Sequence, residues 1–189
     1  MSTVLPALWK SSVSRHTAAA VLSAATTSTI VIGLLLAAEH AIGLRVFGLP
    51  YVATAALIAL MPTAPPARPG VILRAYPAAT IGALTITELL APSQTAAVLS
   101  AVTAVAVMVF LRAPHVPAAL CAGGIGLADP GFAYLWQTLV PALVIVLLGA
   151  AITGRIVPGF SYPPAGARRR RGPVESDRII RFRMGARSK

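Results

Sequence analysis

The sequence predicts an all-α, polytopic transmembrane helical bundle with about five full spans and one short, broken span. Of its 189 residues, 57% are hydrophobic and only 11% are charged, and the mean hydropathy is +0.79. A soluble domain of this size needs roughly a quarter of its residues charged to cover its surface. The apolar residues also stand in long blocks without the 3.6-residue repeat of a helix that turns one face to water. We therefore expect lipid to be the solvent of this chain.

Five apolar blocks approach the length of a membrane span, which is about 20 helical residues for a hydrocarbon core of ~30 Å. They are residues 18–38, 46–61, about 71–90, 95–111 and 132–153. Lys10 and Arg15 precede the first block, which also suggests a secretory signal, but the apolar region of a signal is only ~7–15 residues long. A retained span is the favoured interpretation. Tyr51 and Tyr134 lie near the starts of two blocks, where amphipathic rings favour the membrane interface.

The segment 115–131 is too short and too rich in Gly and Pro to be an ordinary span. One interpretation is irregular backbone at membrane depth, which must be enclosed by protein and often marks a transporter's binding site. The other is that Gly123, Gly124 and Gly126 simply allow close helix packing. The sequence leaves both interpretations open with equal weight.

Cations in short loops predict the topology, because loops that carry Lys and Arg stay in the cytoplasm. Arg68, Arg74 and Arg112 would then lie on the same side as the N-terminus. This pattern is best kept if residues 115–131 cross the membrane and do not merely dip into it. We expect six crossings with both termini cytoplasmic, in a bacterial plasma membrane.

The same reasoning divides the chain into three parts. They are a cytoplasmic segment (1–17), a transmembrane domain (18–155) and a basic cytoplasmic tail (156–189).

A candidate solute pathway lies around the fourth and broken spans. Arg112 and His115 would share a face if the fourth helix continued, and with Arg74 they could form a cationic vestibule that attracts anions. The candidate pathway residues are Arg74, Arg112, His115, Pro117, Gly123, Gly124 and Gly126. The alternative is that the arginines reach the lipid headgroups and that His115 caps carbonyls at the proline turn.

Catalysis has little support in the sequence. It contains no nucleophile elbow, HExxH, Walker loop or dinucleotide fingerprint, so we do not expect an enzyme. Cys121 is the single cysteine and the three histidines are far apart in the chain, so no disulfide within the chain, metal site or cofactor is expected.

The net charge of +11 lies mostly in residues 160–189. This tail contains the run Arg168, Arg169, Arg170 and Arg171. Near an anionic leaflet each cation contributes ~1 kcal/mol, so we expect the run to bind lipid headgroups. A protein or RNA partner is the less favoured alternative, and the high pI is not evidence for a nucleic-acid-binding domain.

Two stretches resemble the signature region of the HPP family of integral membrane proteins. They are FLRAPHVPAALCAGGIGL (110–127) and FAYLWQTLVPALVIVLLGA (132–150), and PPARPGVI (65–72) resembles the family's Pro-rich inner loop. The family motif His-Pro-Pro reads His115-Val116-Pro117 here.

The resemblance covers about residues 44–155. It implies a compact membrane domain and a transporter, and some plastid and cyanobacterial relatives carry nitrite. We therefore expect transport of a small inorganic anion such as nitrite, with a non-transporting scaffold or accessory subunit as the alternative. A chain of this size buries only a small interior, so a homo-oligomer is among the expected partners.

Overall fold

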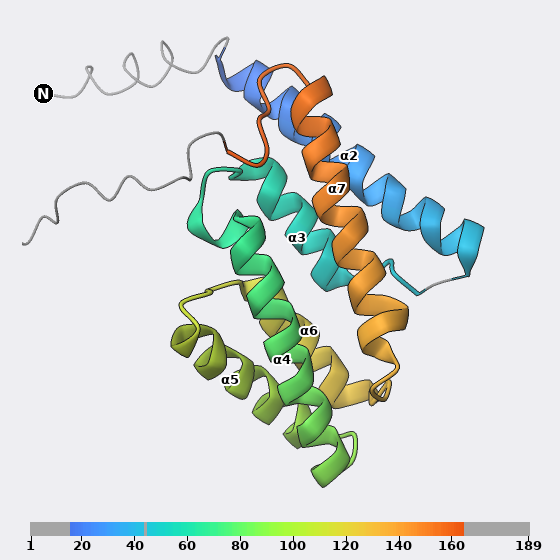
Figure 1. Cartoon of the computed structure of the whole chain (residues 1–189). Coiled ribbons are helices and arrows are strands. Elements are labelled where there is room, and N and C mark those ends of the chain that lie inside the picture. The colour runs from blue at the N-terminus through green and yellow to red at the C-terminus, as the bar shows by residue number, and fades with distance from the viewer. Residues whose placement is uncertain (1–15, 44, 165–189) are drawn as a thin grey trace, which may run out of the picture.

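The structure is a computed structural model, and it describes residues 16–43 and 45–164. These residues form six α-helices whose directions alternate along the chain, and they contain no strand (Figure 1). The helices are α2 (His16–Ile42), α3 (Leu49–Leu60), α4 (Pro69–Leu90), α5 (Gln94–Phe110), α6 (Val116–Ala128) and α7 (Val140–Ile156). The predicted all-α bundle is confirmed.

The number of full-length spans is smaller than the five expected. Three helices are long and apolar enough to cross a membrane: Ala18–Ile42, Pro69–Leu90 and Leu135–Ile156, the last including a π-helical turn at Leu135–Leu139. The other three, α3, α5 and α6, have 12, 17 and 13 residues. At 1.5 Å per residue, α3 is only about 18 Å long.

The late start of α3 explains part of this difference. Residues 45–48 are not helical, and Gly48 is extended (φ −135°, ψ 148°). Pro50 then stands within the first two helical positions, where its missing amide hydrogen costs nothing. The second apolar block is therefore partly an extended approach and partly a short helix.

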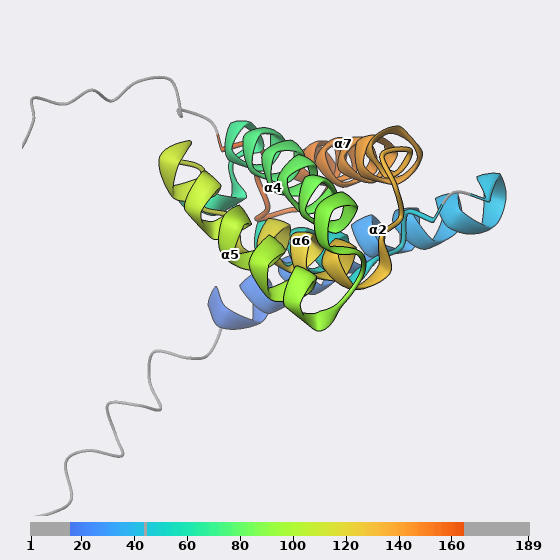
Figure 2. The same ribbon diagram turned by 90° about the horizontal axis from the view of Figure 1, so that it is seen from below.

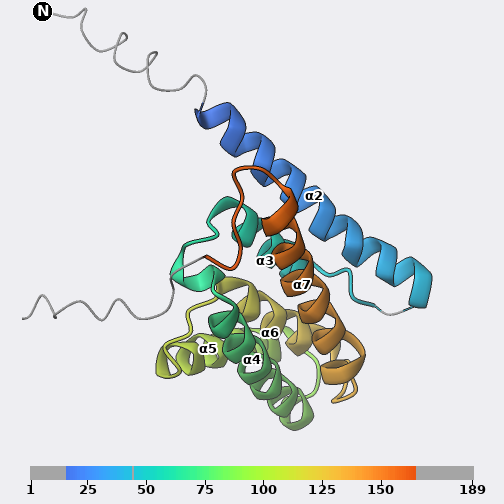
Figure 3. The same ribbon diagram turned by 45° about the horizontal axis from the view of Figure 1, so that its top comes forward.

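The helices form two neighbouring sets. α6 packs against α4 and α5, and α2 packs against α3 and α7, while α3 also contacts α6 and joins the sets (Figures 1 and 2). α2 lies at the edge of the bundle, where it crosses α3 and α7 (Figure 3). This arrangement places α3, α4 and α6 around one interior.

The chain stays packed beyond the predicted end of the membrane domain at residue 155. Phe160 and Tyr162 are buried, and the Tyr162 hydroxyl donates to the Ala67 carbonyl oxygen at 2.9 Å. A Cβ on Gly154 would lie 2.5 Å from the carbonyl oxygen of Tyr162, so the close approach of this segment requires glycine. The prediction of a solvated tail from residue 156 onward is therefore wrong for its first residues.

Two predicted features lie outside the described residues. They are the segment before residue 16 and the lipid-binding run Arg168, Arg169, Arg170 and Arg171.

Candidate functional site

The segment expected to be broken is a regular helix. α6 runs without interruption from Val116 to Ala128, with His115 as its N-cap and Pro117 in its first turn. Asp129 ends it in a left-handed conformation (φ 41°, ψ 70°). The prediction of irregular backbone over residues 115–131 is wrong for this helix, whose peptide groups bond to one another and need no enclosing cavity.

The three glycines of α6 have different surroundings. Gly126 is buried against the start of α5, where a Cβ would lie 2.4 Å from Ala97 Cα, and its carbonyl oxygen accepts from the Ser93 amide at 3.1 Å. A Cβ on Gly123 would make only ordinary contacts at 3.8 Å, and one on Gly124 would meet nothing within 4 Å. Close helix packing is therefore the role of Gly126 alone.

His115 lies at the centre of a buried polar group, although it was expected at a vestibule. Its side chain is 1% exposed. The ring Nε2 lies 3.0 Å from the Thr54 hydroxyl of α3, and Nδ1 lies 2.9 Å from the Pro66 carbonyl oxygen. Thr54 also lies 2.8 Å from the Tyr76 hydroxyl of α4, and both hydroxyls reach the Pro50 carbonyl oxygen, at 3.0 and 2.8 Å. We call His115, Thr54 and Tyr76 the His115 group.

The hydrogen bonds of the His115 group close on themselves. A carbonyl oxygen can only accept, so Nδ1, which faces Pro66, carries the ring proton and Nε2 accepts. The Thr54 hydroxyl can donate to Nε2, and Tyr76 donates to Pro50. Each of the three side-chain protons therefore has an acceptor inside the group.

A second buried group lies beside the first. The Tyr51 hydroxyl is 2.8 Å from the Tyr134 hydroxyl, which is 3.3 Å from Cys121 Sγ. The Tyr51 and Tyr76 rings stack at 5.5 Å and connect the two groups. We call Cys121, Tyr134 and Tyr51 the Cys121 group.

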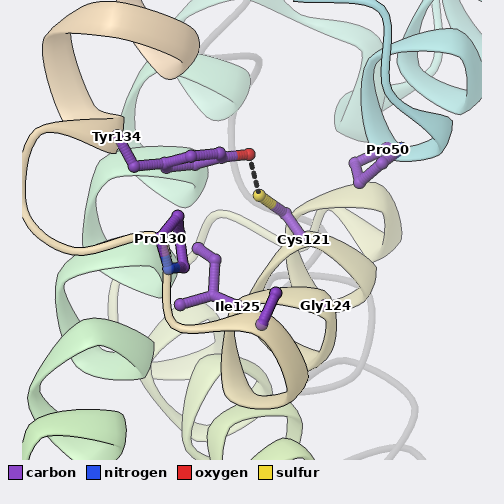
Figure 4. A pocket seen from close by; sticks show the side chains of 7 residues that line it. Pro50, Cys121, Gly124, Ile125, Pro130 and Tyr134 are labelled. Carbon is purple, nitrogen blue, oxygen red and sulfur yellow. Dashed lines mark hydrogen bonds between the residues drawn. The ribbon is translucent and has the colours of Figure 1, made fainter. Parts of the chain in front are cut away.

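A cavity of about 200 Å³ adjoins the Cys121 group. Tyr134 and Cys121 point toward one another at this cavity (Figure 4). It is lined by Pro50, Cys121, Gly124, Ile125, Ala128, Pro130 and Tyr134.

The polar side chains of α4 lie within that long helix, whereas Tyr134 directly precedes the helix Leu135–Ile156 and Tyr51 lies in the first turn of α3. Tyr76 and Thr80 are about 10 and 17 Å from the start of α4, which is about 33 Å long at 1.5 Å per residue. The hydrocarbon core of a membrane supplies no water, so buried polar side chains of a spanning helix must be bonded within the protein or serve a function.

The loop between α3 and α4 covers the His115 group. Its 3₁₀ turn, Pro65–Ala67, is tied down twice: His115 bonds to the Pro66 carbonyl, and Tyr162 bonds to the Ala67 carbonyl. Burial raises the pKa of Tyr162, so its phenol remains a donor. The interior is thus closed at this end, while the cavity lies toward the opposite end of α6.

Comparison with known proteins identifies the family. The model of the family described as "HPP, transmembrane region" matches residues 13–167, which is most of the chain. The chain belongs to the HPP family. It is therefore an integral membrane protein, as predicted. No curated protein and no solved structure matches it.

The altered residue of the HPP motif lies away from the polar interior. Val116, which replaces the middle proline, is 72% exposed at the first position of α6, whereas His115 and Pro117 on either side are buried. The first turn of a helix suits either residue. The change from Pro to Val therefore leaves the His115 group intact.

The two predicted arginines of this HPP domain do not join His115. α5 ends at Phe110, and Arg112 is exposed with a φ of 50°, so it shares no helical face with the buried His115. Arg74 is exposed and donates to the Gly70 carbonyl at 2.8 Å and to the Leu111 carbonyl at 3.3 Å. The arginines are neighbours at the surface, and the histidine points inward.

Most members of the two groups were missed in the sequence. Tyr51 and Tyr134 looked like interfacial anchors, and Thr54 and Tyr76 lie within apolar blocks. The spacing of Tyr76 and Thr80, one helical turn apart, was the available signal for a polar face on α4. Among the described residues, no cluster of three His, Cys, Asp or Glu side chains could hold a metal ion.

Proposed function

We propose that this HPP protein moves a small inorganic anion across the membrane, with nitrite as the first candidate. The observation that supports the proposal is the pair of buried polar groups inside the bundle, with an adjoining cavity. An interior built only for packing needs few polar side chains, because buried polar groups in a membrane bundle are costly.

The arrangement fits an alternating-access cycle in one of its two states. The cavity lies on the Ala128 and Pro130 side, and the loop held by His115 and Tyr162 closes the other side. Opening that side requires the bonds to Pro66 and Ala67 to break while the cavity closes. Arg74 and Arg112, exposed near this end, would raise the local concentration of anions.

A membrane scaffold or accessory subunit is the second candidate, and two observations favour it. Gly126 packs α6 directly onto the α5 backbone, and Arg112 is turned away from His115. A scaffold of this kind needs a tight bundle and no moving loop.

Uptake of labelled nitrite into proteoliposomes tests the proposal. We expect uptake above that of empty liposomes, and loss of most of it in the double variant His115→Ala/Arg112→Ala. The matched control is Thr153→Val, because this buried hydroxyl bonds only to Gly149 and Ala150 of its own helix. The control should retain uptake.

Absence of uptake for nitrite, nitrate, formate and chloride would reject transport of small anions and favour the scaffold. Uptake that the double variant leaves unchanged would reject a pathway through this interior.

A further inference from the structure

The Cys121 group differs from the His115 group in its balance of donors and acceptors. Cys121, Tyr134 and Tyr51 each carry one proton, and only two hydrogen bonds join them. Thr80 of α4 lies beside Cys121 and is 0% exposed, and its hydroxyl has no hydrogen-bond partner among the described residues. The three side chains of the Cys121 group and Thr80 carry four protons in all. Two of these protons have no acceptor in the described part of the chain.

Among Tyr51, Thr80, Cys121 and Tyr134, the surplus consists of donors. Within the described residues, the hydroxyls and the thiol of the Cys121 group have only one another as acceptors, and sulfur accepts only weakly. In the His115 group, by contrast, two backbone carbonyl oxygens take up the protons. A buried donor without an acceptor is costly, so this site favours a ligand that brings acceptors.

We propose that Tyr51, Thr80, Cys121 and Tyr134 form the binding site for a small oxyanion, which the adjoining cavity admits. This inference rests on the proposed function for the choice of nitrite as the probe. The cavity of about 200 Å³ has room for a three-atom ion and water, since one water needs roughly 10–15 Å³ of cavity space.

The chemistry of the site favours a monovalent ion that is bound and then released. Hydroxyl and thiol donors stabilise an anion without the strong attraction of a paired cation. The ion can therefore enter the site and also leave it, as movement across a membrane requires. Asp129 lies between the lining residues Ala128 and Pro130, and one of its carboxylate oxygens is buried without a partner in the part of the chain that the structure describes. Its negative charge opposes a divalent anion about twice as strongly as a monovalent one.

Equilibrium binding to the purified full-length protein in nanodiscs tests this site without any need for transport. The first measurement is the thermal unfolding midpoint in sodium nitrite compared with sodium gluconate at equal ionic strength. The second is the rate at which the small neutral reagent methyl methanethiosulfonate labels Cys121, the single cysteine of the chain. We expect nitrite to raise the midpoint, and to slow labelling by about elevenfold at ten times its Kd.

The decisive variants remove one buried hydroxyl each. Thr80→Val should abolish the nitrite-induced rise in the midpoint, and should itself raise the midpoint without nitrite because it removes an unpaired hydroxyl. Thr27→Val is the matched control, since the Thr27 hydroxyl is also buried and has no partner within residues 16–43 and 45–164, but lies on α2, away from the cavity. It should keep the full response to nitrite. Tyr134→Phe, which keeps the ring, should abolish the response to nitrite in the same way as Thr80→Val.

The outcomes separate the site from the transport proposal. Protection of Cys121 that is lost in Thr80→Val and Tyr134→Phe supports the site even if liposomes show no uptake. The site is wrong if nitrite uptake occurs but nitrite neither protects Cys121 nor raises the midpoint. It is also wrong if Thr80→Val and Tyr134→Phe respond to nitrite as fully as Thr27→Val.

Discussion

Two glycines of α6, separated by one residue, should respond in opposite ways to alanine. In Gly126→Ala the new Cβ would lie 2.4, 2.6 and 2.7 Å from Ala97 Cα, Ala97 N and the Ala96 carbonyl oxygen. These are backbone atoms of α5, so no side chain can rotate away. In Gly124→Ala the new Cβ meets nothing within 4 Å.

The magnitudes follow from these contacts. Relief of the Gly126→Ala overlap requires α6 and α5 to separate by about 1 Å, and overpacking of this kind costs roughly 1–3 kcal/mol. The same movement strains the bond from the Ser93 amide to the Gly126 carbonyl, worth about 1 kcal/mol. Gly124→Ala should instead stabilise the helix by about 0.5–1 kcal/mol. Both substitutions share the gain from replacing a helical glycine, so the two variants should differ by the overlap and the strained bond, roughly 2–4 kcal/mol, about thirtyfold or more in the unfolding equilibrium.

Unfolding in mixed micelles with increasing SDS, followed by far-ultraviolet circular dichroism, measures this difference. Both variants are compared with the unaltered protein in the same micelles. Equal unfolding midpoints for Gly126→Ala and Gly124→Ala would refute the packing of α6 on α5 described above.

Three further variants test other contacts. Tyr162→Phe removes the donor to the Ala67 carbonyl and should cost about 1–3 kcal/mol, with faster amide hydrogen exchange in the loop before α4; unchanged exchange would contradict the proposed closure. Thr54→Val keeps the side-chain shape but leaves His115 Nε2 unpaired, so SDS unfolding should show a loss of about 1–3 kcal/mol, more than for Thr153→Val. Asp129→Asn removes a negative charge beside the cavity, so half-saturation of uptake should need severalfold less nitrite at low salt; an equal or higher requirement would contradict this electrostatic role.

The composition and the proline positions determined the elements of this fold. Long apolar blocks predicted helices, and the rules for prolines are local: Pro69 begins α4, and Pro50 stands in the first turn of α3. The family was also evident in the residues around His115, and the match to the HPP family confirms it. Composition misled at α6, because a helix in lipid tolerates glycines when no water competes for its backbone hydrogen bonds.

Only the tertiary structure decided which polar side chains meet. Thr54 and His115 are 61 residues apart in the chain, and Tyr51 and Tyr134 are 83 apart. In a soluble protein, the 3.6-residue repeat of apolar residues would show which face of each helix is interior. Here lipid and interior are both apolar, so the sequence determined where the helices are, and packing alone determined which way each one turns.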